Sequence, residues 1–179
     1  VSSSVNVKNP GYFVVWKSDG TIWEYGTTED SKIESQTDGN VVLKWLVSKI
    51  TDRNGNAITY HYYENRNTGE SVIESIEYAS NKYVNAEPAY RVSFEYKDKL
   101  DPKTAYVHGN MVSNTKILDK IEVYNNDSSK KIIEYSLKYD QPGFYNNMYY
   151  LHYRLKSIQL TIDGKKINPT NVIWNSQDK

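Results

Sequence analysis

A short pattern that occurs four times constrains this sequence more than any other feature. Each copy begins with an apolar residue, two variable residues and an isoleucine. A turn follows, and then an alternating apolar segment that ends in an aromatic residue. The copies begin at Val47, Ile73, Leu118 and Leu155. Because side chains alternate between the two faces of a strand, each copy predicts a β-hairpin, and repeated hairpins are typical of sheets and shells.

The copies begin at residues 47, 73, 118 and 155, so they are too unevenly spaced for a strict solenoid. They indicate a degenerate repeat in which the strand pairs persist and the loops vary. No segment shows a helical period, so we expect an all-β fold in which consecutive antiparallel hairpins form a curved sheet. The predicted strand pairs are residues 12–16 with 21–25, 41–51 with 57–63, 72–78 with 89–97, 116–124 with 131–139, and 150–162 with 170–174. Residues 26–40 and 98–113 are expected to be irregular.

Composition limits the classes of function. The 179 residues contain no cysteine, which excludes disulfides and thiolate metal sites within them. Lysine plus arginine equals aspartate plus glutamate at 22 each, which argues against nucleic acid or an anionic membrane as the main partner. No apolar run approaches the length of a membrane span. We expect one domain over residues 1–179 and, because the chain begins at Val1 without methionine, a piece of a longer protein.

Tyrosine dominates the aromatic residues, with 17 tyrosines against three phenylalanines. Its ring is apolar and its hydroxyl requires a partner, so a tyrosine-rich strand suits a sheet face that is half wet. We expect one face to be hidden against neighbouring hairpins or cargo. The side chains predicted to line it are Leu46, Ile50, Ile58, Tyr60, Tyr62, Ile76, Val92, Phe94, Ile121, Leu137, Tyr139, Ile158 and Trp174.

The stretch from residue 45 to 63, with Asp52, Asn54, Gly55 and Asn56 at its turn, resembles a signature of SpvB-type virulence-plasmid proteins and of the B components of insecticidal toxin complexes. These proteins are related to the Rhs and YD-repeat proteins. Residues 19–26 are similar to the stretch that precedes the signature in this family, and residues 90–96, 116–124, 134–139 and 154–158 follow in the family's order. The resemblance covers roughly residues 12–174.

This resemblance implies a hairpin sheet that winds into a hollow shell around a toxic C-terminal polypeptide, which carries the activity. The chain is far too short to close a shell. Asp101-Pro102 lacks the context of the family's self-cleavage motif, and no Glu-x-Glu pair of an ADP-ribosyltransferase occurs. The resemblance therefore transfers the scaffold and not the toxicity. Its partners would be the remaining hairpins of the shell and the enclosed toxin, and its location would be secreted or on the bacterial cell surface.

The sequence offers no catalytic, cofactor or metal site. Asp52, Asn54 and Asn56 alternate like the start of a calcium loop, but Ala57 and Tyr63 occupy positions where such a loop needs glycine and glutamate. We interpret the segment as a hairpin turn in which Asn54-Gly55 supplies positive φ angles. No nucleophile motif or phosphate-binding glycine loop occurs. We predict that the chain is not an enzyme.

The alternative hypothesis is a carbohydrate- or cell-surface-binding module. Aromatic residues gather near the C-terminal end, and exposed aromatic rings can stack on sugars or anchor a protein partner. The candidate binding surface comprises Tyr145, Tyr149, Tyr150 and Tyr153. A sheet-edge or core role for these rings is the competing interpretation.

Overall fold

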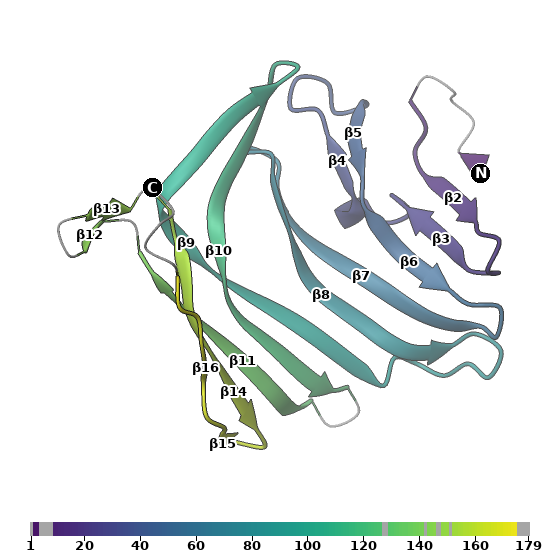
Figure 1. The fold of residues 1–179 in the computed structure, drawn as a ribbon. Coiled ribbons are helices and arrows are strands. Elements are labelled where there is room, and N and C mark those ends of the chain that lie inside the picture. The colour runs from purple at the N-terminus through teal and green to yellow at the C-terminus, as the bar shows by residue number, and fades with distance from the viewer. Residues whose placement is uncertain are drawn as a thin grey trace.

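The fold is one large, curved antiparallel sheet that does not close on itself (Figure 1). The computed structural model describes residues 2–3, 9–126, 129–141, 143–145, 148–150 and 152–174. Within these residues twelve strands form the sheet, in the order β1-β2-β3-β6-β7-β8-β9-β10-β11-β14-β15, and β16 also pairs with β14. Strands adjacent in the sheet follow one another along the chain nearly throughout, as expected for consecutive hairpins. The predicted all-β class and curved hairpin sheet are therefore confirmed.

Each predicted strand range overlaps a strand of the main sheet, whereas β1 and β15 lie outside all of the predicted ranges. Their bounds are β1 Ser2–Ser3, β2 Phe13–Trp16, β3 Ile22–Tyr25, β6 Val47–Thr51, β7 Asn56–Asn65, β8 Glu70–Asn81, β9 Tyr90–Val107, β10 Asn110–Asn125, β11 Lys130–Asp140, β14 Arg154–Ile162, β15 Lys165–Lys166 and β16 Thr170–Asn171. No helix among the described residues is long and apolar enough to cross a membrane.

Two short hairpins lie outside the main sheet, and both correct the prediction. Residues 26–40 are not a loop: they contain the 3-10 turn η1 (Glu29–Ser31) and β4 (Lys32–Glu34). β4 pairs with β5 (Val42–Trp45), so the predicted strand 41–51 is two strands in two sheets. The chain turns between them at Leu46, whose N–H donates to Ser31 O at 2.8 Å and whose carbonyl accepts from Gly26 N at 2.9 Å. The second hairpin joins β12 (Gly143–Tyr145) to β13 (Met148–Tyr150). The predicted strand 150–162 is therefore also wrong as one strand, because β13 ends at Tyr150 and β14 of the main sheet begins at Arg154.

The largest difference from prediction is residues 98–113, which are not irregular. β9 and β10 continue through them as a long two-stranded hairpin that extends beyond the neighbouring strands (Figure 1). We call residues 98–116 the arm. The register is interrupted at its base, where residues 99–102 of β9 lie opposite Thr115 alone. Pro102 cannot donate a ladder hydrogen bond, so an interrupted ladder accommodates it. At the tip, His108 and Gly109 have φ angles of 48° and 79°, as in a two-residue type I′ turn.

Register shows that the sheet has one apolar and one polar face. Directly opposite residues point to the same face. One chain of opposite residues crosses six strands from β7 to β14 and is apolar throughout. We call it the apolar row: Tyr60, Ile76, Val92, Val123, Ile133 and Ile162.

The apolar face is only half-buried, which corrects the expected core. None of the thirteen side chains predicted to line a hidden face is fully buried, and Ile58 and Trp174 remain 38% and 45% exposed. Among the described residues, the buried hydrophobic ones are Ile33 and Ala57. The physical reason is that the described sheet is a single layer, so the apolar face has no second layer against which to pack.

Candidate functional site

A hydrogen bond closes the hairpin repeat in three of its four copies. The Tyr62 hydroxyl donates to Val47 O at 2.8 Å, and the Tyr96 hydroxyl donates to Ile73 O at 2.8 Å. In the last copy, Trp174 Nε1 donates to Leu155 O, also at 2.8 Å. The aromatic residue that ends each of these copies thus bonds to the carbonyl of the residue that begins it. We call this contact the lock.

The lock gives a physical reason for the recurring pattern. An aromatic side chain covers apolar surface with its ring and brings a donor to a backbone carbonyl at the splayed end of the strand pair. Burial, with smaller contributions from Tyr60 and Asp30, raises the pKa of Tyr62 to about 12. Burial likewise raises the pKa of Tyr96. Both hydroxyls therefore stay protonated as donors at neutral pH.

The third copy has no lock. No hydrogen bond from the Tyr139 hydroxyl to Leu118 O, or to any other described residue, is present. The Tyr139 ring lies edge-to-face on Tyr153, with centroids 6.2 Å apart, and Lys97 Nζ lies 5.4 Å from its centroid. The pairing of β10 with β11 stops at Lys120↔Ser136, two residues past Leu118. Pairing stops at the equivalent positions in the first two copies, so what distinguishes the third copy is the contact of Tyr139 and not the separation of its strands.

The signature turn is a closed network of hydrogen bonds. Asp52 Oδ1 accepts from Asn54 N at 2.8 Å and from Asn56 N at 2.9 Å, and Oδ2 accepts from Asn56 Nδ2 at 2.8 Å. The Asn56 side-chain bond, and then the backbone bonds, lower the pKa of Asp52. Gly55 has φ 83°, whereas Asn54 has no positive φ, so only one of the two predicted positive angles is present. A Cβ at Gly55 would lie 2.5 Å from the Tyr83 ring. Both oxygens of the Asp52 carboxylate thus accept hydrogen bonds within the turn.

Successive turns are joined along one rim of the sheet. Arg53 Nη2 donates to Asp19 O at 2.5 Å, and Asn81 Nδ2 donates to Asn56 Oδ1 at 2.8 Å. Further along, Asn126 Nδ2 donates to Pro88 O at 3.0 Å. Each hairpin turn is therefore tied to the next, which fixes the order and spacing of the hairpins along the curve.

The base of the arm is held by one buried carboxylate. Glu70, 5% exposed, accepts from Thr115 N at 2.6 Å, Lys116 N at 3.1 Å and Thr115 Oγ1 at 2.5 Å. These donors lie where the β9–β10 ladder is interrupted, so Glu70 supplies acceptors that the ladder lacks. Next to it, Gly69 has φ 61° and a Cβ there would lie 2.0 Å from Met111 O, so only glycine fits.

The tip of the arm is fixed to the segment after β4. Asn110, 3% exposed, accepts through Oδ1 from Ser35 Oγ at 2.9 Å and Gln36 N at 2.8 Å. The Gln36 amide pairs with the Met111 backbone in both directions, at 2.9 and 3.0 Å. The arm is therefore attached at both ends and encloses space between them.

The polar face is covered with ion pairs. Lys131 Nζ lies 2.8 Å from Glu122 Oε1 and also pairs with Glu134, which is directly opposite Glu122 in the ladder. The hydrogen bonds to Glu122 and then to Glu134 raise the pKa of Lys131. Lys120 pairs with Glu95 at 2.7 Å. Glu122 and Glu134 would repel each other across the strands, and the ammonium group of Lys131 offsets that repulsion. The ion pairs of Glu122 and Glu95 join neighbouring strands.

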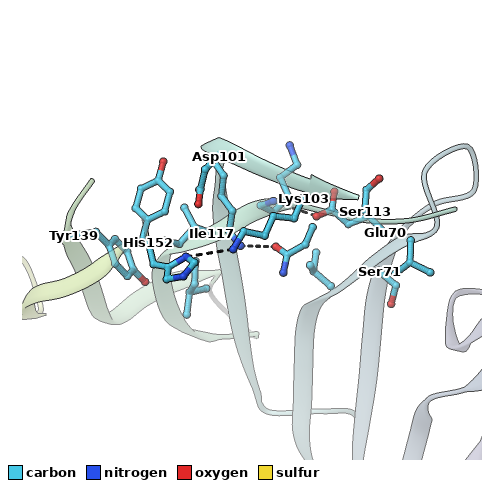
Figure 2. Close-up of a pocket in the computed structure, with 15 residues that line it drawn as sticks. Glu70, Ser71, Asp101, Lys103, Ser113, Ile117, Tyr139 and His152 are labelled. Atoms are coloured by element: carbon cyan, nitrogen blue, oxygen red, sulfur yellow. Dashed lines mark hydrogen bonds between the residues drawn. The ribbon is translucent and has the colours of Figure 1, made fainter. Parts of the chain in front are cut away.

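A pocket of about 700 Å³ lies at the arm, beside the unlocked third copy (Figure 2). Its wall includes the bulged part of β9, facing residues of β10, and Tyr139 at the end of β11. Lys103 Nζ and His152 Nδ1 meet there at 3.2 Å (Figure 2). The polar side chains that line it, with Tyr139, include Lys99, Asp101, Lys103, Asn114 and His152.

The predicted aromatic surface is only partly within the described structure. Tyr145 lies in β12, and Tyr149 and Tyr150 lie in β13, but their side chains are outside the described part of the chain. Tyr153 is half-buried: its hydroxyl accepts from Leu100 N at 2.7 Å, and its ring contacts Tyr139. Tyr153 therefore belongs to the wall of the large pocket.

Sequence analysis missed the arm and with it the pocket. The available signal was His108-Gly109 between short apolar segments, which is a two-residue hairpin turn. Glu70 and Asn110 gave no local signal, because their partners are 45 and 75 residues away in sequence.

Comparison with known proteins agrees with this architecture. The family model for the Salmonella virulence plasmid 65kDa B protein (SpvB) matches residues 3–141. Among curated proteins, no match was found.

Solved structures share the fold at low sequence identity. The N-terminal domain of the effector protein SpvB from Salmonella typhimurium strain LT2 aligns with a TM-score of 0.67 at 13% identity, over 84% of this chain and 61% of that one. The TcdB2-TccC3 crystal structure aligns with a TM-score of 0.72 at 10% identity, over 94% of this chain and 11% of that one. The Photorhabdus luminescens Tc holotoxin pore aligns with a TM-score of 0.75 at 12% identity, over 96% of this chain and 10% of that one. The chain thus spans about a tenth of the two toxin-complex chains.

Proposed function

Because the chain belongs to the SpvB family, matched over residues 3–141, we propose that it is a non-enzymatic wall segment of a bacterial toxin shell. In this proposal the sheet is one part of a larger curved wall, secreted or displayed on the cell surface. Its partners are the other hairpins of that wall and an enclosed toxin polypeptide.

The observation that carries this proposal is the half-buried apolar row on a single-layer sheet. A row of six apolar residues crosses the sheet from Tyr60 to Ile162, yet Ile162 is still 39% exposed. Apolar area left in water is unfavourable by roughly 25 cal/mol per Å², so such a continuous face favours a covering partner. An enclosed polypeptide or neighbouring hairpins would supply that cover.

The arrangement of polar groups supports a structural role. Asp52 closes a turn, Glu70 holds the base of the arm, and Glu122 takes part in a cross-strand ion pair. Locks and joined turns fix the curvature of the sheet. The likeness to TcdB2-TccC3 and to the Tc holotoxin pore supports the same proposal.

The test is site-specific photo-crosslinking in the full gene product that carries this chain. A benzophenone amino acid replaces Phe94, on the apolar face, or the adjacent Glu95, on the polar face. We expect crosslinks from position 94 to the enclosed polypeptide and none from position 95. Equal crosslinking from both positions, or crosslinking to cargo from position 95 alone, would contradict the proposal.

A further inference from the structure

The pocket at the third copy contains chemistry that the sheet does not use. At the corresponding place in the other three copies, the closing aromatic donates to a backbone carbonyl. At the third copy Tyr139 instead lines a pocket of about 700 Å³, and its hydroxyl has no partner among the described residues. The volume lies in the usual range for small-molecule sites.

Two lysines in this pocket have no carboxylate partner among the described residues. Lys99 Nζ donates to Asn114 Oδ1 at 2.5 Å, and Lys103 Nζ lies 3.2 Å from His152 Nδ1. Neither amine forms an ion pair within the described part of the chain, whereas the third lysine of the wall, Lys116, pairs with Asp98 at 2.7 Å. Lys99 and Lys103 alternate with Asp101 along one bulged stretch of β9. Two positive charges thus face one pocket, and one carboxylate lies between them.

The carboxylates of the wall differ in what they can still bind. Glu70 already accepts three hydrogen bonds from Thr115 and Lys116. Asp101 has one oxygen that is shielded from solvent and has no hydrogen-bond partner among the described residues. A buried acceptor without a donor is unfavourable, so the Asp101 carboxylate still has the capacity to accept a hydrogen bond from a ligand hydroxyl.

We propose that this pocket binds an acidic sugar. The carboxylate of the sugar lies between Lys99 and Lys103 and accepts charge-assisted hydrogen bonds from both. Its ring hydroxyls meet Asp101, Asn114 and the free hydroxyl of Tyr139. A mixture of two amines, one carboxylate, an amide and a phenol matches a ligand that has both an anionic group and several hydroxyls. This site is independent of the shell function and does not rest on it.

The test is calorimetric titration of the purified protein with sodium glucuronate, neutral glucose, inorganic phosphate and an acidic dipeptide. We expect saturable binding of glucuronate that is weakened by salt, and weaker binding of the other three. No binding of glucuronate at millimolar concentration would overturn the proposal. If glucose binds as tightly as glucuronate, the lysines do not select for the acidic group and the proposal is wrong. If phosphate or the dipeptide binds as tightly as glucuronate, the pocket is not specific for a sugar and the proposal is also wrong.

Variants assign the binding to this pocket. The double variant Lys99→Gln/Lys103→Gln is expected to weaken glucuronate binding by about tenfold or more, since two charge-assisted bonds are lost. The matched control is Lys165→Gln/Lys166→Gln on β15, where both side chains are exposed and neither lines the pocket. Tyr139→Phe should weaken binding while leaving the melting temperature unchanged. Equal affinity in the double variant and its control would refute the assignment.

Discussion

At the scale of single residues, each locked hairpin depends on one donor, which is a tyrosine hydroxyl in two copies and the Trp174 indole N–H in the last. Tyr62 and Tyr60 lie two positions apart on β7, but only the Tyr62 hydroxyl bonds to a backbone carbonyl. We predict that Tyr62→Phe lowers the free energy of unfolding by about 1 kcal/mol, the usual net contribution of one hydrogen bond. Tyr60→Phe is the matched control, with an expected loss near zero. Urea unfolding followed by circular dichroism measures both, and equal losses would refute the lock.

The same hydroxyl predicts a dependence on alkaline pH. The fold raises the pKa of Tyr62 from 10.0 to about 12, chiefly by burial, so the folded state holds this proton more tightly than the unfolded state. This contribution to stability is fully present below the unfolded pKa and is lost as the pH rises through the folded pKa. We expect the stability of the wild type to fall between pH 10 and 12, and that of Tyr62→Phe to fall less steeply. Parallel decreases in urea midpoint would contradict this.

At the scale of elements, the arm depends on a contact remote in sequence. Glu70 accepts two backbone N–H groups at the interrupted ladder and is buried. Replacing it with alanine leaves those donors unpaired, which costs about 1–3 kcal/mol for a buried group. We predict that Glu70→Ala speeds amide hydrogen exchange in residues 110–116 while exchange in β7 is unchanged. Glu70→Gln, which keeps one acceptor oxygen, should have a smaller effect. Uniform acceleration across both strands would show that Glu70 supports the whole sheet instead.

Local sequence patterns predicted the hairpins whose two strands are joined by a short turn. They failed where segments that are distant in sequence come together. Alternation together with turn chemistry placed the strand pairs on either side of Asp19-Gly20 and of Asn54-Gly55 close to their actual positions. It missed β4, because the strand is three residues long and is formed by pairing with β5. It missed the arm, because Asp101-Pro102 reads as a strand breaker, whereas the interrupted ladder and Glu70 accommodate it.

The candidate site could be predicted only in part. The turn role of Asp52 followed from the spacing of Asp52 and Asn56, which is a local property. The pocket did not follow, because Tyr139 and Lys103 lie on strands that are distant in sequence and line one pocket only in the folded sheet. The Tyr62 lock was visible as an aromatic at a fixed place in the repeat, but its acceptor, Val47 O, is apparent only in the structure.

At the scale of the molecule, the central claim is that one face of a single-layer sheet is apolar and only half covered. Predicting which residues are apolar on one face required only alternation. Predicting how deeply they are buried required knowing that no second layer exists among the described strands. Ile58 and Ala57 show the contrast, because they are adjacent on β7 and point to opposite faces, and they are 38% and 6% exposed.

Thiol labelling of these two positions tests the claim most directly, since the chain contains no cysteine of its own. We predict that the Ile58→Cys variant reacts with a thiol reagent in native buffer, without unfolding. The Ala57→Cys variant should react only at the rate at which the protein unfolds. If Ile58→Cys proves as protected as Ala57→Cys, the apolar face is covered and the account of an open sheet is wrong.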